Sequence, residues 1–253
     1  MIDIDHPVMP GCDAGLQALT RWEDTFLTLE QTAIERRFDM PFHKTYPVNG
    51  VFINDWHRHL SQAAGSTGMI EIGVEGWLLP VDALKLYELG YFCGGDILEL
   101  GTYRGLSTSI LGKAIADSGT ERIVVTVDLD PNATATARIN LQGRPGAESI
   151  HLFNAEAGKA VRDLAQAKRT FSFGFIDHSH QYEHVFDVCQ SLHRVLDIGA
   201  FALFHDFNDP RNAAPAATDY GVYQGALDGL RADRFEFWGI FGCCGLFRRA
   251  GPC

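Results

Sequence analysis

From residue 96 onward, short apolar runs alternate with segments of helical spacing, and this alternation limits what the chain can fold into. Apolar runs rich in β-branched and aromatic residues predict strands, and apolar residues recurring at three- and four-residue steps predict helices. Strands that alternate with helices favour a mostly parallel, doubly wound sheet in an α/β fold. The predicted strands are 96–100, 122–127, 149–153, 171–176 and 200–204, and the predicted helices are 106–116, 133–141, 158–167 and 182–196.

The last two apolar runs lie much closer together than the others. Residues 235–241 and 245–248 are aromatic-rich and flank Gly242, Cys243 and Cys244. This spacing suits an antiparallel hairpin, which would complete a Rossmann-like sheet of seven strands. The six cysteines show no Cys-x-x-Cys pair, so we interpret Cys243 and Cys244 as small core residues rather than a redox pair.

The first 75 residues have a different pattern. Apolar residues at helical steps over 16–33 predict an amphipathic helix that packs on the core or forms a subunit interface. Over 38–59, aromatic residues lie among prolines, glycines and basic residues, which suits a loop-rich cap over a site. Residues 77–89 should form the helix that leads into the sheet. We therefore predict a helical N-terminal cap region, 1–75, an α/β domain, 76–253, and a homodimer or larger homo-oligomer.

Composition excludes several classes of partner. The chain has 32 acidic and 21 basic side chains, for a formal charge of −11, which repels phosphate backbones and anionic lipid headgroups. Its apolar stretches are shorter than the roughly 20 residues that span a bilayer. The N-terminus carries acidic residues where a signal peptide has basic ones. We expect a cytoplasmic protein with neither a nucleic-acid nor a membrane partner.

The segment between the first predicted strand and helix carries the most chemical information. Gly101 and Gly105 let the backbone approach a ligand closely, and Glu99 stands at the end of the strand. The dinucleotide pattern G-x-G-x-x-G is not matched because residue 103 is tyrosine, and the P-loop lysine is missing, so pyrophosphate binding is disfavoured. Asp128 ends the next strand, where an acid suits a ribose diol.

These residues and the seven-strand pattern resemble the class I S-adenosylmethionine-dependent methyltransferases over residues 75–249. Residues 175–184 (FIDHSHQYEH) and 203–207 (LFHDF) are similar to the metal-dependent branch that methylates hydroxyls of sugars and natural products, the methyltransferase domain 24 type. The resemblance implies S-adenosylmethionine as cofactor and a small-molecule acceptor. It assigns cofactor binding to Glu99, Gly101, Thr102, Tyr103, Gly105, Ser107, Asp128, Leu129, Ala155 and Glu156.

The same resemblance implies a divalent metal at the ends of the fourth and fifth strands. Its ligands would be Asp177 and Asp206, with His205 where relatives often carry a second acid or a histidine. Hard oxygen ligands suit Mg²⁺, and a metal there would position the acceptor and favour its deprotonated form. His180 matches the position of a general base, so Asp177 and His180 are the predicted catalytic residues.

Two alternatives stay open. A metal-dependent hydrolase could use His178, His180 and His184 together with His205 and Asp206, although it would leave the glycine loop unexplained. A catalytically inactive cofactor-binding protein would keep the loop without needing the metal and base residues. The methyl acceptor, and whether its reacting atom is O, N or C, is not specified by the sequence, although residues 208–221 and 38–59 should border its site.

Overall fold

A single seven-stranded sheet forms the centre of the computed structural model, which describes residues 31–39 and 52–251. The strand order is β3-β2-β1-β4-β5-β7-β6, and β7 runs opposite to the other six strands of this sheet. The α/β class, the doubly wound parallel sheet and the antiparallel hairpin predicted from the sequence are therefore confirmed. The strands are β1 (Ile97–Leu100), β2 (Val124–Asp128), β3 (Ile150–Asn154), β4 (Phe171–Ile176), β5 (Leu196–Phe204), β6 (Phe235–Phe241) and β7 (Cys244–Arg249).

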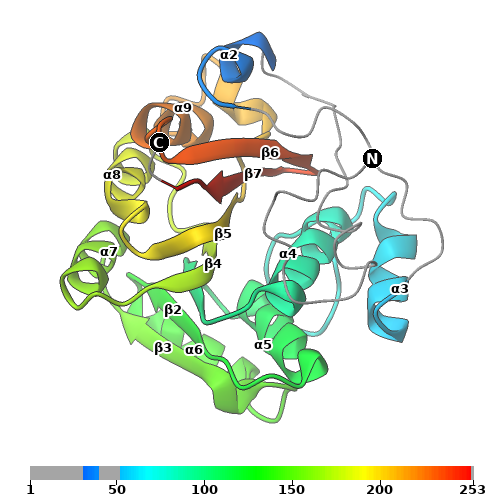
Figure 1. Ribbon diagram of the computed structural model, residues 1–253. Coiled ribbons are helices and arrows are strands. Elements are labelled where there is room, and N and C mark those ends of the chain that lie inside the picture. Colours follow the sequence, from blue (N-terminus) through cyan, green and yellow to red (C-terminus); the bar gives the residue numbers. More distant parts are fainter. Residues whose placement is uncertain (1–30, 40–51, 252–253) are drawn as a thin grey trace.

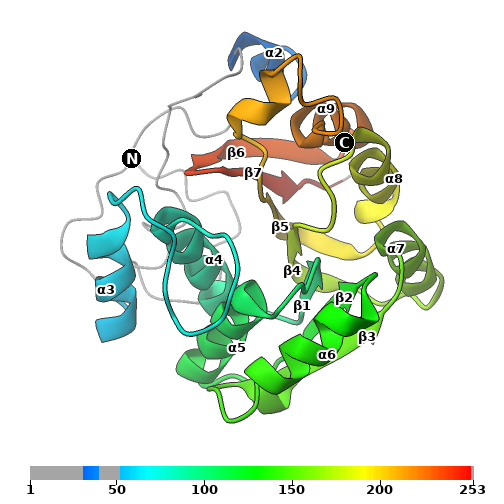
Figure 2. The ribbon, with the colours of Figure 1, turned by 180° about the vertical axis from the view of Figure 1, so that it is seen from behind.

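Helices cover both faces of this sheet. In Figure 1, α7, α8 and α9 lie side by side along one side of the sheet, whereas α4 and α5 pack together on the other. The reverse view in Figure 2 shows α6 over β2 and β3. Within the described ranges, no helix is both long and apolar enough to cross a membrane. The helices are α2 (Gln31–Glu35), α3 (Asp55–Ala63), α4 (Pro80–Phe92), α5 (Leu106–Ser118), α6 (Pro131–Asn140), α7 (Ala157–Gln166), α8 (Tyr182–Leu192) and α9 (Val222–Gly229), with short 3₁₀ helices η1 (Ala147–Ser149) and η2 (Pro210–Ala213).

The helix predicted over 77–89 begins and ends three residues later, as α4, and a larger boundary error lies between α8 and β5. The helix expected over 182–196 ends at Leu192, and β5 begins at Leu196, four residues before its predicted start at 200. Leu196 pairs with Phe171 of β4, and the register then shifts before the pairing resumes at Phe201. The residues between them are largely exposed, so an apolar run marks only the buried second half of the strand.

The described N-terminal residues join the same core as the sheet. Ile34 of α2 and Phe38 are buried in it, and the ring of Phe38 lies 5.3 Å from that of Phe247 on β7. Only residues 31–33 of the predicted helix over 16–33 lie within the described part of the chain. The assignment of its apolar face to the core or to a subunit interface, and with it the oligomeric state, stays a prediction.

The predicted cap over 38–59 is wrong for its last eight residues. Asn54 begins α3 by accepting a hydrogen bond from the backbone N–H of His57, and its amide reaches Tyr87 at 2.7 Å and Asp117 at 3.0 Å. Asp117 lies at the C-terminal end of α5, whereas the glycine loop lies at its N-terminal end. Residues 52–59 therefore support the back of the domain, and residues 40–51 lie outside the described ranges.

Candidate cofactor and metal site

The carboxyl ends of β1, β2, β4 and β5 meet at one edge of the sheet. β1 pairs with β2 on one side and with β4 on the other, so the strand order reverses at β1. Ligands of doubly wound folds bind in the crevice at such a reversal. The residues singled out from the sequence follow these four strands and are brought to this edge.

Gly101 joins the loop after β1 to the end of β4. Its φ is +103°, and a β-carbon there would overlap the backbone carbonyl of Asp177. Its N–H donates to Val127 of β2 at 2.8 Å. Only glycine can adopt this φ and also lie so close to the Asp177 carbonyl. Gly101, predicted to give a ligand access to the backbone, therefore also packs the loop against the end of β4.

Glu99 is fully buried beneath this loop. Thr108 donates a hydrogen bond to its Oε2 at 2.6 Å, and its Oε1 has no hydrogen-bond partner within the described structure. Burial raises the pKa of Glu99 to about 7, although nearby hydroxyls of Ser107, Thr108 and Thr126 lower it. The remaining acceptor fits a ligand that brings a hydrogen-bond donor or a positive charge.

Asp128 stands at the open side of the same loop. Its Oδ2 accepts the N–H of Tyr103 at 2.7 Å, and its Oδ1 accepts the N–H of Asp130 at 2.8 Å. Leu129 beside it is 71% exposed, and the ring of Tyr103 lies 5.4 Å from that of Trp77, which is also exposed. A carboxylate with free lone pairs among exposed apolar side chains fits a ribose diol next to an aromatic base.

The other predicted cofactor residues have structural partners. Thr102 and Thr126 share a hydrogen bond of 2.6 Å, and the N–H of Ala155 donates to the carbonyl of Asp128 at 3.1 Å. Glu156 begins α7, and its carboxylate accepts the N–H groups of residues 158 and 159 at 2.7 and 2.6 Å. Its carboxylate thus acts as a helix N-cap, and its contact with the cofactor stays a prediction.

The predicted metal ligands converge at the ends of β4 and β5. His205 Nδ1 lies 3.3 Å from an oxygen of Asp177 and 3.2 Å from an oxygen of Asp206. This nitrogen is buried, and neither carboxylate meets it in hydrogen-bond geometry. A buried nitrogen without a partner, facing two carboxylates, is the donor set that a divalent cation would satisfy.

His180 completes the cluster from the solvent side. Its Nε2 lies 2.9 Å from Asp206 Oδ2, and its ring stacks on Tyr220 with centroids 4.7 Å apart. The guanidinium of Arg211 also lies over the Tyr220 ring, 4.3 Å from its centroid, and is 3.7 Å from Asp206 Oδ1. Two residues of the segment 208–221, Arg211 and Tyr220, thus lie against this cluster.

These contacts determine the charges in the cluster. Burial raises the pKa of Asp206, but its contacts with His180 and His205 hold that pKa well below its usual range. Burial lowers the pKa of His205, yet the carboxylates of Asp177, Asp206 and Asp82 raise it well above its usual range. The hydrogen bond to Asp206 also raises the pKa of His180. The cluster is therefore built to hold positive charge between ionised carboxylates.

The three-histidine site of the hydrolase alternative is not assembled. His178 Nε2 lies 3.3 Å from the carbonyl of His184, and His184 Nδ1 contacts the hydroxyl of Ser179 at 3.0 Å. Among the described residues, the groups of close ligand atoms contain His180 and His205 but neither His178 nor His184.

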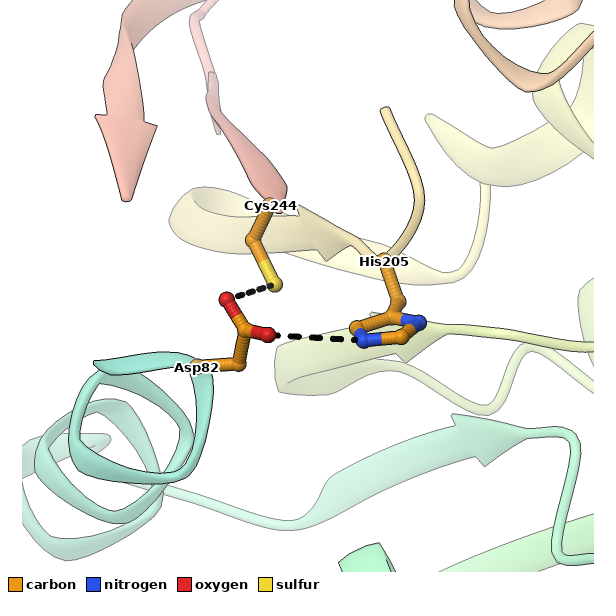
Figure 3. A group of neighbouring side chains, drawn as sticks. All are labelled: Asp82, His205 and Cys244. Atoms are coloured by element: carbon orange, nitrogen blue, oxygen red, sulfur yellow. Dashed lines mark hydrogen bonds and ion pairs between the residues drawn. The ribbon is translucent and has the colours of Figure 1, made fainter. Parts of the chain in front are cut away.

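Two residues of the site were missed in the sequence. Asp82, in the first turn of α4, points toward His205, and its Oδ2 lies 3.6 Å from His205 Nε2 (Figure 3). Cys243, expected in the core, is partly exposed and its thiol lies 3.4 Å from Asp206 Oδ1, whereas Cys244 is buried as expected. An acid within the apolar helix after Pro80 was the available signal for Asp82, because a buried acid needs a polar partner.

Several solved structures share the fold of most of this chain. A cofactor-bound protein from MTB, Rv0187, is 21% identical with a TM-score of 0.53, and the match covers 77% of this chain and 88% of that one. An O-methyltransferase from Klebsiella pneumoniae is 18% identical with a TM-score of 0.54, covering 80% and 91%. The O-methyltransferase from Bacillus cereus, in complex with SAH, is 15% identical with a TM-score of 0.51, covering 78% and 91%.

The sequence itself matches one family model. No curated protein matches the chain, but residues 98–207 match the family described as a methyltransferase domain, Methyltransf_24. The matched segment runs from β1, before the glycine loop, to the turn after β5 that carries His205 and Asp206. This match, the strand order and the glycine loop identify residues 98–207 as a methyltransferase domain.

Proposed function

We propose that this methyltransferase acts on a hydroxyl oxygen of a small molecule and uses a divalent metal held by Asp177, His205 and Asp206. The observation that carries this proposal is the buried Nδ1 of His205, which faces two carboxylates without a hydrogen-bond partner. Hydroxyls need such assistance because they hold their protons strongly at neutral pH. Oxygen is also the acceptor named for the Klebsiella and Bacillus proteins.

The cofactor loop and the predicted metal ligands lie close together, which supports direct transfer of the methyl group to the acceptor. The sulfonium methyl group is already activated, so the enzyme must align the acceptor oxygen with it and remove a proton. The close approach of Gly101 to Asp177 puts the cofactor loop beside the predicted metal ligands. A divalent metal held by Asp177, His205 and Asp206 would supply the positive charge that lowers the pKa of a hydroxyl group.

His180 is the proposed proton acceptor. Its ring is about half exposed, so an acceptor molecule can reach it, and Asp206 at 2.9 Å stabilises the imidazolium that forms. Tyr220 holds the ring in place by stacking. The net charge of −11 disfavours nucleic acid, so we propose a sugar or natural-product hydroxyl as the acceptor class.

Cofactor binding is tested first. Calorimetric titration with S-adenosylhomocysteine should show one site per chain, and titration with NAD⁺ should show none. A chain that binds NAD⁺ but not S-adenosylhomocysteine would contradict the cofactor assignment.

Metal use is tested separately. Transfer of a labelled methyl group from S-adenosylmethionine to panels of sugars and phenols should identify an acceptor. Chelator should then reduce turnover while leaving the affinity for S-adenosylhomocysteine unchanged. Full turnover in chelator would show that the reaction proceeds without a metal.

A further inference from the structure

Asp82 links three segments that are distant in sequence (Figure 3). It is only 1% exposed. Its Oδ1 accepts the N–H of Cys243 at 2.9 Å and lies 3.7 Å from the thiol of Cys244. Its Oδ2 accepts the N–H of Leu79 at 3.2 Å and lies 3.6 Å from His205 Nε2. A single buried carboxylate thus joins the start of α4, the β6–β7 turn and the end of β5.

The contacts of Asp82 make it a support rather than a metal ligand. Backbone N–H groups and a thiol already engage both of its oxygens. Where a cation between Asp177 and Asp206 takes the place of the Nδ1 proton, His205 can offer that nitrogen as a ligand. The carboxylate of Asp82, 3.6 Å from Nε2, would then hold the remaining proton on Nε2 and keep the ring in this orientation.

We propose that Asp82 is a positioning residue that makes His205 an Nδ1 ligand, so that the site favours a nitrogen-accepting transition-metal ion over Mg²⁺. This inference rests on the metal site of the proposed function and replaces the Mg²⁺ expected from the sequence. Mg²⁺ takes oxygen ligands, whereas imidazole suits Zn²⁺, Co²⁺ and related ions. The buried histidine occupies a place where a carboxylate would give an all-oxygen donor set.

The ligand role of His205 is tested by exchanging its donor atom. Most sites bind Co²⁺ more tightly than Mg²⁺, so the informative quantity is the ratio of the two affinities, measured calorimetrically with each metal alone on the full chain. His205→Asp should lower the Co²⁺-to-Mg²⁺ ratio by about tenfold or more and change the visible absorption spectrum of bound Co²⁺. An unchanged ratio and spectrum would overturn the proposal.

The positioning role of Asp82 is tested by a charge-removing variant. Asp82→Asn should weaken Co²⁺ binding by about 10- to 100-fold and shift the Co²⁺ spectrum, while S-adenosylhomocysteine binding persists. Cys244→Ala is the matched control because it disturbs the same buried carboxylate without removing its charge beside His205. Co²⁺ affinity should change by about twofold or less in this control.

The outcomes separate this inference from the proposed function. If Asp82→Asn binds Co²⁺ like the wild type, or if Cys244→Ala weakens Co²⁺ equally, the positioning role is wrong. If Asp82→Asn loses S-adenosylhomocysteine binding through misfolding, the His205→Asp ratio and spectrum decide the metal preference. If the proposed function is wrong but this inference is right, methyl transfer will be complete in chelator while the variants still show the expected changes in metal affinity.

Discussion

The two halves of the site hold their carboxylates in opposite ways. In the cofactor half, Glu99 and Asp128 are held by hydroxyl and backbone N–H groups, which carry no net charge. In the metal half, Asp177 and Asp206 face the imidazole of His205. The first arrangement leaves negative charge for a cationic sulfonium ligand, whereas the second is arranged to enclose a cation. Substitutions should therefore affect the two halves separately, except where the halves touch.

Gly101 is the point of contact, so its substitution should have the largest effect. In Gly101→Ala the new methyl group would overlap the Asp177 carbonyl at a φ that disfavours alanine, and we expect a stability loss of about 3 kcal/mol or more. Calorimetry should detect neither S-adenosylhomocysteine nor metal binding. Gly119→Ala is the control, because its φ is also positive but no atom lies within 4 Å. Retained binding of both ligands in Gly101→Ala would show that the halves are independent.

His180 lies only in the metal half, so its loss should leave the cofactor half intact. Once an acceptor is identified, His180→Ala should lower the rate of transfer by about 10²- to 10⁴-fold. The affinity for S-adenosylhomocysteine should stay within about twofold of the wild type. His184→Ala is the neighbouring control and should have a mild effect, because its ring faces Ser179. A fully active His180→Ala enzyme would remove this residue from the proton transfer.

Glu99 gives the cofactor half a pH-dependent cost in stability. The folded pKa of about 7 exceeds the ordinary value of 4.5, so the unfolded chain loses this proton first as the pH rises. Stability is therefore full below pH 4.5 and falls until pH 7. Glu99→Gln should remove this loss and raise the free energy of unfolding by about 3 kcal/mol at pH 8, with little gain at pH 4.5.

Urea denaturation at the two pH values measures this difference. Glu183→Gln, at an exposed position on α8, is the matched control and should change stability equally little at both. A gain for Glu99→Gln that is the same at both pH values would show that the buried carboxylate is ionised throughout.

Substitution of Asp128 should have the smallest effect, and it should change cofactor affinity without changing metal affinity. Asp128→Asn should raise the Kd for S-adenosylhomocysteine by about 10- to 100-fold, because a hydrogen bond to a charged group contributes about 1.5–3 kcal/mol. Metal affinity should be unchanged. Asp177→Asn should give the reverse pattern in the same two titrations. If either variant weakens both ligands, the division into two halves is wrong.

Local patterns predicted the fold better than they predicted the site. Apolar runs located all seven strands because most of the strands are buried, yet they missed the exposed first half of β5. The resemblance assigned Asp177 and His205 as ligands, and the structure brings them together because both directly follow strands whose ends converge in such sheets. Asp82 follows no strand and reaches His205 only through the packing of α4 against the β6–β7 turn. Such a residue cannot be assigned from local sequence.

The hydrogen bond from Cys243 to Asp82 has a consequence for the order in which the protein is made. It joins positions 161 residues apart, and long-range contacts of this kind must wait for the later segment to be synthesised. The parallel pairing of β1 with β2 and β4 needs no residue beyond 176, so the glycine loop can take its shape on the ribosome. Asp82 meets its backbone partner only after the β6–β7 turn has emerged. We therefore expect the cofactor half to form before the contact through which Asp82 is proposed to orient His205.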